Sequence, residues 1–319
     1  MGALRELLRP PAHRGPVIAG GAVALTTGLL LEQIRISPGD GWQLAVLALP
    51  AALLLWLGVQ ARLEGGRPPA YQSVLLVCGL LLLYGALLRF ADLVDDDFGL
   101  EFPDGWLAVT GLVQASVAAW VAVRRNSAVA ALIAAVAAAI ALLSGWSWVF
   151  DTESVTPYRW LLLALAIAYA IGSLPLRGMS QRHAEQMINA AGLMILAIAV
   201  LEPLAGGLFG LLGAELPGFW ELVLLAAGFG LIAYAAADRA PGPAYVGTLV
   251  LLAFVAYAGY FGDDLRWWPL ALLALGVAGL AAGLRPRAPL PPEPSGYRRD
   301  ELPLAARTGD DVTVRVRQD

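Results

Sequence analysis

Loops of opposite charge alternate along this chain and separate ten apolar stretches, each long enough to cross a membrane. A helix needs roughly 20 apolar residues to cross the hydrocarbon core, because each residue adds about 1.5 Å. The predicted spans cover residues 17–34, 42–60, 71–91, 106–123, 128–150, 160–176, 184–203, 219–237, 243–261 and 267–284. We therefore expect an all-α fold, a polytopic transmembrane helical bundle of about ten spans.

Arginines mark the segment before the first span and then every second loop, whereas the other loops are rich in carboxylates. By the positive-inside rule, the arginine-bearing loops are cytoplasmic, so both termini are predicted to be cytoplasmic. The arginines that carry this pattern are Arg5, Arg9, Arg14, Arg62, Arg67, Arg124, Arg125, Arg177, Arg182, Arg239, Arg285 and Arg287.

The composition agrees with a membrane protein. Hydrophobic residues make up 59% of the chain and charged residues only 14%, whereas soluble domains carry about 25% charged residues. The lipid bilayer is therefore the expected surroundings. All 21 basic residues are arginine, which indicates a GC-rich bacterial genome, so we expect a multi-pass protein of the bacterial inner, or plasma, membrane.

Three regions are expected. Residues 1–16 form a basic cytoplasmic N-terminal segment, and residues 17–284 form the ten-span domain. Residues 285–319 form a tail rich in proline and arginine. Such a composition cannot bury enough apolar surface to fold alone, so the tail is predicted to be disordered and cytoplasmic.

Tryptophans stand on the acidic side of the spans. They lie at or beside the start of each even-numbered span, at Trp42, Trp106, Trp160, Trp220, Trp267 and Trp268. Together with the acidic loops they predict five helical hairpins, each joined by an acidic turn and returning through an indole. The alternative is the ordinary aromatic belt of membrane proteins.

Several chemistries lack their residues in this chain. Without lysine, neither a Schiff base nor a phosphate-binding P-loop can form. The two histidines, His13 and His183, fall in or beside predicted cytoplasmic segments, and the single Cys78 lies inside a span. We therefore expect no enzyme activity, no cofactor, no metal site and no nucleic-acid partner.

Ionisable groups near the outer ends of the spans are the main candidates for a binding site. Such groups are costly within a bilayer and often face a cavity or a partner. Arg89 and Asp92 are three residues apart, so they share a helical face and can form an ion pair. The predicted binding residues at this depth are Glu32, Arg89, Asp92, Asp151, Glu202, Glu221, Trp106 and Trp160.

If these side chains shared one space, they would form an acidic, tryptophan-rich outer vestibule. Aromatic faces attract cations and carboxylates supply the counter-charge, so a cationic or amphipathic small molecule would suit it. The alternative for each residue is an interfacial group that reaches out to water.

Gln114 is the polar candidate nearest the middle of the membrane. It lies four residues after Thr110 and therefore on the same face of its helix. It is predicted either to line a cavity or to hydrogen-bond between helices, a bond worth about 1 kcal/mol.

Two functions follow from this inventory. The first is a small-molecule transporter with the acidic outer vestibule. The second is a non-transporting sensor, assembly factor or scaffold that binds a partner through its outer loops or tail. A polar cavity that reaches Gln114 would favour the transporter, and a solid core of alanine and leucine would favour the scaffold.

Overall fold

Nine α-helices make up most of the part of the chain that the computed structural model describes. These described residues are 14–35, 41–61, 69–98, 103–151, 154–205, 216–260, 273–274 and 276–277. The helices are α2 (Gly15–Arg35), α3 (Gly41–Gln60), α4 (Ala70–Phe98), α5 (Pro103–Arg125), α6 (Ala128–Phe150), α7 (Val155–Met179), α8 (Gln181–Ala205), α9 (Gly218–Asp238) and α10 (Pro241–Tyr260). The predicted all-α class is confirmed.

Eight of these helices, α2 to α9, are long and apolar enough to cross a bilayer, whereas α10 contributes a shorter apolar stretch, Pro241–Tyr257. The predicted tenth span, 267–284, lies outside the described residues except for four positions, and so does the predicted tail, 285–319. The predicted number of ten is therefore corrected to about eight, because an apolar stretch counts as a span only where a continuous helix of sufficient length is present.

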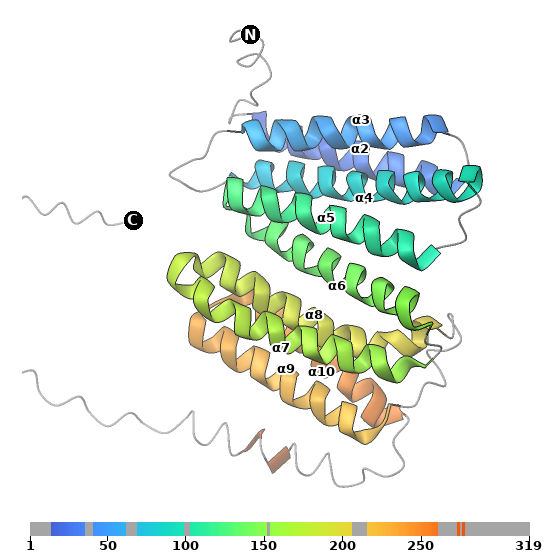
Figure 1. Ribbon diagram of the computed structural model, residues 1–319. Helices are drawn as coiled ribbons and strands as arrows, with labels where there is room; N and C mark the ends of the chain where they lie inside the picture. Colours follow the sequence, from blue (N-terminus) through green and yellow to red (C-terminus); the bar gives the residue numbers. More distant parts are fainter. Residues whose placement is uncertain are drawn as a thin grey trace, which may run out of the picture. The chain divides into compact units, whose positions relative to one another are not determined.

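Consecutive helices pack most closely where arginine lies in their connection or in the last helical turn before it. The most extensive contacts pair α3 with α4, α5 with α6, α7 with α8, and α9 with α10 (Figure 1). The predicted partners across acidic turns, such as α2 with α3 and α6 with α7, touch far less. The predicted hairpins were therefore wrong by one helix, because the sign of a loop's charge does not determine which of its neighbours pack together.

Very short turns explain three of the four close pairs, whereas nine residues separate α3 from α4. Two residues separate α5 from α6, one residue separates α7 from α8, and two residues separate α9 from α10. Asn126 and Arg239 have φ angles of 51° and 53°, the left-handed conformation that commonly ends a helix. Ser127 then caps the start of α6 with its side chain. Because each connection is so short, the two helices that it joins must lie antiparallel and side by side.

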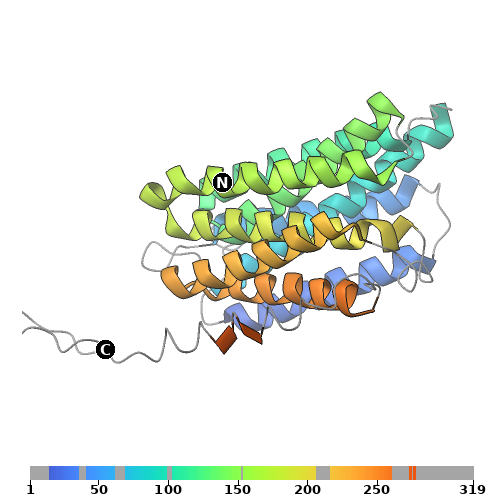
Figure 2. The same ribbon diagram turned by 90° about the horizontal axis from the view of Figure 1, so that it is seen from below.

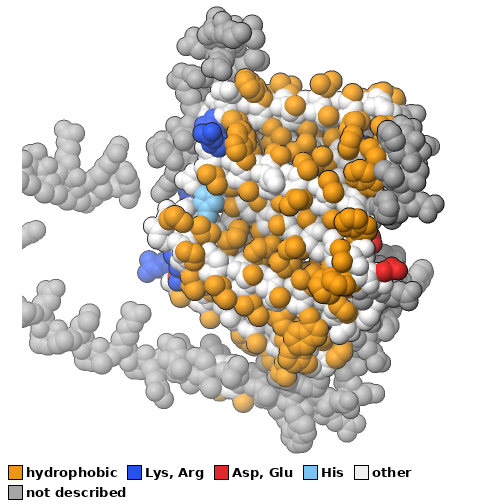
Figure 3. Space-filling model, viewed as in Figure 1, with side chains coloured by type: hydrophobic (Ala, Val, Ile, Leu, Met, Phe, Trp, Pro, Cys, Tyr) orange, Lys and Arg blue, Asp and Glu red, His pale blue; other side chains and the backbone are white. Residues whose placement is uncertain are grey.

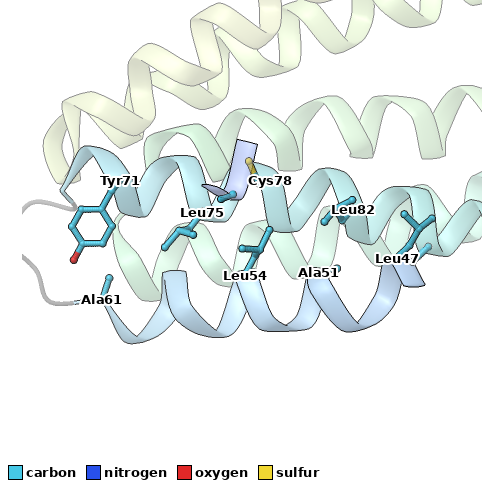
Figure 4. Packing of buried hydrophobic residues seen from close by; sticks show 10 residues of the cluster. Leu47, Ala51, Leu54, Ala61, Tyr71, Leu75, Cys78 and Leu82 are labelled. Carbon is cyan, nitrogen blue, oxygen red and sulfur yellow. The ribbon is translucent and has the colours of Figure 1, made fainter. Parts of the chain in front are cut away.

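The N-terminal bundle, α2–α6, contains two apolar cores. In the first, α3 and α4 pack along their lengths (Figure 4), with Leu47 and Leu82 toward one end and Ala61 and Tyr71 at the other. The second core joins α4 to α5 and α6. It consists of the buried residues Leu76, Leu80, Ala118, Val121, Ala122, Ala130 and Ala131. The alternation of leucine with alanine lets neighbouring helices approach closely.

Polar side chains also fasten the N-terminal bundle. Gln72 on α4 is fully buried, and its Nε2 donates to the carbonyl oxygen of Gly58 on α3 at 2.8 Å. Arg125, at the end of α5, donates from Nη2 to the carbonyl oxygen of Ala61 at 3.1 Å. Such bonds join helices that have no hydrophobic driving force to associate within lipid.

The C-terminal bundle, α7–α10, is centred on α8. This helix contacts α7, α9 and α10, and Figure 2 shows it between α7 and the α9–α10 pair. Where α9 meets α10, a Cβ added to Gly247 would lie 2.9 Å from the carbonyl oxygen of Gly228. Glycine at position 247 is therefore required for the backbones of α9 and α10 to approach this closely. The Tyr257 hydroxyl on α10 also donates to the carbonyl oxygen of Ala199 on α8.

Charge separates to the two ends of the helices. On the face shown in Figure 3, basic side chains lie at one end, acidic side chains at the other, and hydrophobic side chains cover the middle. We call these the basic end and the acidic end. The nine helices belong to one compact unit, Met1–Gly262, and the chain continues as a second unit, Asp263–Asp319. The structure thus agrees with the alternation of loop charge in the sequence.

Candidate functional site

The structure brings two groups of the predicted binding residues together. Arg89 pairs with Asp92, and its Nη1 lies 3.4 Å from the Asp92 Oδ2. Arg89 also reaches across to α2, where its Nε donates to the Gln33 Oε1 at 2.9 Å and its Nη2 to the Gln33 carbonyl oxygen at 3.0 Å. The predicted ion pair is present, and its arginine also fastens α4 to α2 at the acidic end.

The second group joins α7 to α9. The ring of Trp160 lies 5.1 Å from that of Trp220 and 5.5 Å from that of Phe219, measured between centroids. Glu221 follows Trp220 and is buried, and its Oε2 has no hydrogen-bond partner among the described residues. Trp160 on α7 therefore lies beside the α9 segment that contains Glu221, another predicted binding residue.

Gln114 joins two helices. Its side chain is buried on α5, and Nε2 donates to the carbonyl oxygen of Leu80 on α4 at 2.9 Å. This is the hydrogen-bonding alternative expected from the sequence. The Gln114 Oε1 is also buried and has no hydrogen-bond partner among the described residues.

The remaining predicted residues lie on α2, α5 and α8 and at the end of α6. Glu32 on α2 is exposed, and Asp151 is an exposed residue that ends α6 in the left-handed conformation, with a φ of 43°. Trp106 on α5 is partly buried, and its Nε1 has no hydrogen-bond partner within the described part of the chain. The side chain of Glu202 lies outside the described residues. A vestibule shared by all of them stays a prediction.

A lateral groove between α7 and α9 is the candidate site that the structure adds. It has a volume of about 410 Å³, within the usual range for ligand pockets, and α8 forms its floor. Its lining extends from Leu163 to Ala170 on α7, from Ile188 to Ile195 on α8, and from Val223 to Tyr234 on α9. Nearly all of this lining is apolar, so the groove suits a hydrocarbon chain.

Aromatic rings close the groove toward the acidic end. Trp160 and Trp220 lie one helical turn beyond the lining residues Leu163 and Val223, on the same helix faces. Because their rings are in contact, they bridge the gap between α7 and α9 at this level. Molecules in the groove would meet this aromatic cluster at its far end.

Charged groups stand at the other opening of the groove. Tyr234 lines the groove, and the Arg177 guanidinium carbon lies 4.9 Å from the centre of its ring. The Arg177 Nη2 also lies 3.0 Å from the Asp238 Oδ2, and both side chains are partly exposed. The groove therefore runs from a cation–aromatic–carboxylate cluster at the basic end to indole rings at the other end.

Arg159 is a second buried charged residue beside the aromatic cluster. It precedes Trp160 on α7 and is only 6% exposed, as Glu221 is only 4% exposed on α9. Arg159 is not among the binding residues predicted from the sequence. Its position next to a tryptophan at the start of a span was the available signal.

The groove itself escaped prediction for a physical reason. Apart from Tyr234, its lining consists of alanine, glycine, isoleucine, leucine and valine, the residues of any lipid-facing helix. The combination of Arg177, Tyr234 and Asp238 could have indicated the groove, but the proximity of these side chains depends on the packing of α7 beside α9. Sequence alone did not fix that packing.

Comparison of the chain with protein-family models, with curated proteins and with solved structures finds no match. The class of the protein rests on its own structure. Long apolar helices with charge separated to their two ends define a multi-pass α-helical membrane protein.

Proposed function

We propose that this protein is a membrane carrier for an amphipathic small molecule, and that the lateral groove holds the apolar part of that molecule. The proposal rests on one observation: an apolar space of about 410 Å³ that ends in charged and aromatic side chains. An apolar lining favours a hydrocarbon chain, and the partly exposed Arg177 and Asp238 suit a polar head.

The groove also suits access from the bilayer. Its wall includes Ile167 on α7, whose side chain is 52% exposed, and Gly230 on α9, which is also exposed. A solute that dissolves in lipid could therefore enter sideways between the two helices. We extend the proposal to the orientation expected from the sequence: the basic end faces the cytoplasm of a bacterium.

The scaffold function has an observation of its own. In the N-terminal bundle, Gln72 and Gln114 are committed to bonds between helices, and the cores around them consist of alanine, leucine and valine. A scaffold needs such rigid packing and no solute path. The lateral groove is apolar and its lining does not include Gln114, so it is not the polar cavity that we expected of a transporter. We base the carrier instead on the space that this groove leaves between α7 and α9.

Flux into proteoliposomes tests the carrier. The probes are fluorescently labelled single-chain amphiphiles with cationic, zwitterionic or anionic heads, and dithionite quenching reports how much probe has crossed. We expect the wild-type protein to accelerate at least one probe above protein-free liposomes. If it accelerates none, the carrier function is wrong.

A pair of glycine variants ties the flux to the groove. Gly230 lines the groove and Gly172 on α7 does not, yet an added Cβ would have open space at both. Gly230→Trp should reduce flux at least about five-fold, because overfilling costs roughly 1–3 kcal/mol. Gly172→Trp should retain the wild-type rate. Equal rates in the two variants would remove the groove from the mechanism.

A further inference from the structure

We infer that the lateral groove selects an anionic amphiphile, with its phosphate or carboxylate head against Arg177 and its single hydrocarbon chain extended toward Trp160 and Trp220. This inference rests on the proposed function, because it names the class of ligand for the same groove. It departs from the outer acidic vestibule, which would favour a cationic head.

Arg177 is placed to receive such a head. Its side chain is 43% exposed, and its contact with Asp238 is made by Nη2. A guanidinium carries five N–H donors arranged to match phosphate or carboxylate oxygens. The ring of Tyr234, which lines the groove, lies under the same guanidinium. An anion bound to Arg177 would therefore lie directly at the opening of the groove.

The charge around this opening favours an anion. Arg182 on α8 and Arg239 after α9 are both exposed and follow shortly after Arg177 and Asp238 in the chain. Asp238 and Glu185 are the carboxylates of the same segments, so these segments carry three arginines and two acids, although Arg239 borders the neighbouring space between α9 and α10. Anionic lipids gather at such basic surfaces, and a cationic head would meet an excess of like charge.

The length of the groove suits a single chain within one leaflet. Its lining on α9 runs from Val223 to Tyr234, which corresponds to about 16 Å at 1.5 Å per residue. This is roughly half of the 30 Å hydrocarbon core of a bilayer. The indoles of Trp160 and Trp220 lie one helical turn beyond this lining, so they mark the end of the space that the chain can fill.

Native mass spectrometry of the purified full chain tests the inference. Lipid adducts are measured during titration with phosphatidylglycerol, phosphatidylcholine and lysophosphatidylglycerol of matched chains. We expect anionic adducts at lower concentration than zwitterionic ones, by about five-fold for one arginine contact. The two anionic arms distinguish a bilayer phospholipid from a free single-chain amphiphile, and the single-chain lipid should bind at least as well.

Four variants separate the possible outcomes. Arg177→Gln should abolish the preference for anionic lipid, while Arg177→Lys, which keeps the charge, should restore most of it. Arg124→Gln, at an exposed arginine of the basic end on α5, should leave the preference unchanged. Gly230→Trp should weaken the binding of all three lipids. Thermal unfolding of each variant reports whether it is folded.

The results distinguish this inference from the proposed function. If Gly230→Trp weakens binding but Arg177→Gln retains the preference, the groove holds the chain and the head assignment is wrong. If Arg177→Gln and Arg124→Gln lower the preference equally, the preference arises from general surface charge and the inference is overturned. If Gly230→Trp leaves every adduct unchanged, the groove is not the binding site and both proposals fail.

Discussion

In the N-terminal bundle, Gln72 and Gln114 lie buried and donate to main-chain carbonyls of neighbouring helices. In the C-terminal bundle, Tyr257 forms one such bond, but Arg177, Tyr234 and Asp238 surround the opening of a groove instead. The two bundles are built from similar apolar helices. They show that polar side chains can hold helices together in one half of a membrane protein and surround the opening of an apolar groove in the other.

The backbone contact between α9 and α10 at Gly247 should give the largest effect on stability among the variants proposed here. Gly247→Leu would place a side chain within 2.9 Å of the Gly228 carbonyl oxygen and of the Leu231 Cβ. We expect it to lower the free energy of unfolding by about 3 kcal/mol, the upper range for overpacking. Thermal unfolding in detergent measures this.

Gly172→Leu is the matched control, because an added Cβ there has no neighbour within 4 Å among the described residues. It should unfold close to the wild-type temperature. Equal destabilisation by the two variants would mean that α9 and α10 are not in close contact at Gly247.

Removing a fastening bond from the N-terminal bundle should have a smaller effect. Gln72→Leu deletes the donor to the Gly58 carbonyl oxygen and should cost about 1 kcal/mol, with solute flux per folded molecule unchanged. Ser116→Ala serves as the control, because Ser116 is exposed and bonds to its own helix. A loss of flux in Gln72→Leu without a loss of stability would break the contrast between the two bundles.

The smallest effect is expected at the acidic end. Asp92→Asn removes an ion pair in which the Asp92 side chain is 49% exposed, so it should cost less than about 0.5 kcal/mol. Arg89→Gln also loses the two bonds to Gln33 and should cost about 1 kcal/mol. Chemical or thermal unfolding of both variants measures this difference. If Asp92→Asn were less stable than Arg89→Gln, the account would be contradicted.

Much of the helical structure could be predicted from hydropathy. The span predicted at 128–150 coincides with α6, and the span predicted at 42–60 differs from α3 by one residue. The loop charges also predicted the separation of basic and acidic ends. These features depend on local composition and on the cost of charge in lipid, both of which are visible in the sequence.

Helix pairing and the groove could not be predicted in the same way. Asn126, Ser180 and Arg239 stand in turns whose shortness determines three of the four close pairs, but only exact helix ends reveal how short the turns are. The groove requires α7 and α9 to leave a space above α8, and the apolar side chains that line it resemble those that face lipid. Arg89 and Asp92 were predictable as a pair because both lie on one helix.

Photocrosslinking tests the central claim, that an amphiphile lies between α7 and α9, most directly. Lysophosphatidylglycerol with a diazirine in its chain is activated in membranes that contain the full chain, and mass spectrometry maps the labelled peptides. The account predicts that labels concentrate between Leu163 and Ala170 on α7 and between Val223 and Tyr234 on α9, and that Gly230→Trp removes them. Labels spread evenly over the outer faces of α2–α6, or unchanged in Gly230→Trp, would contradict it.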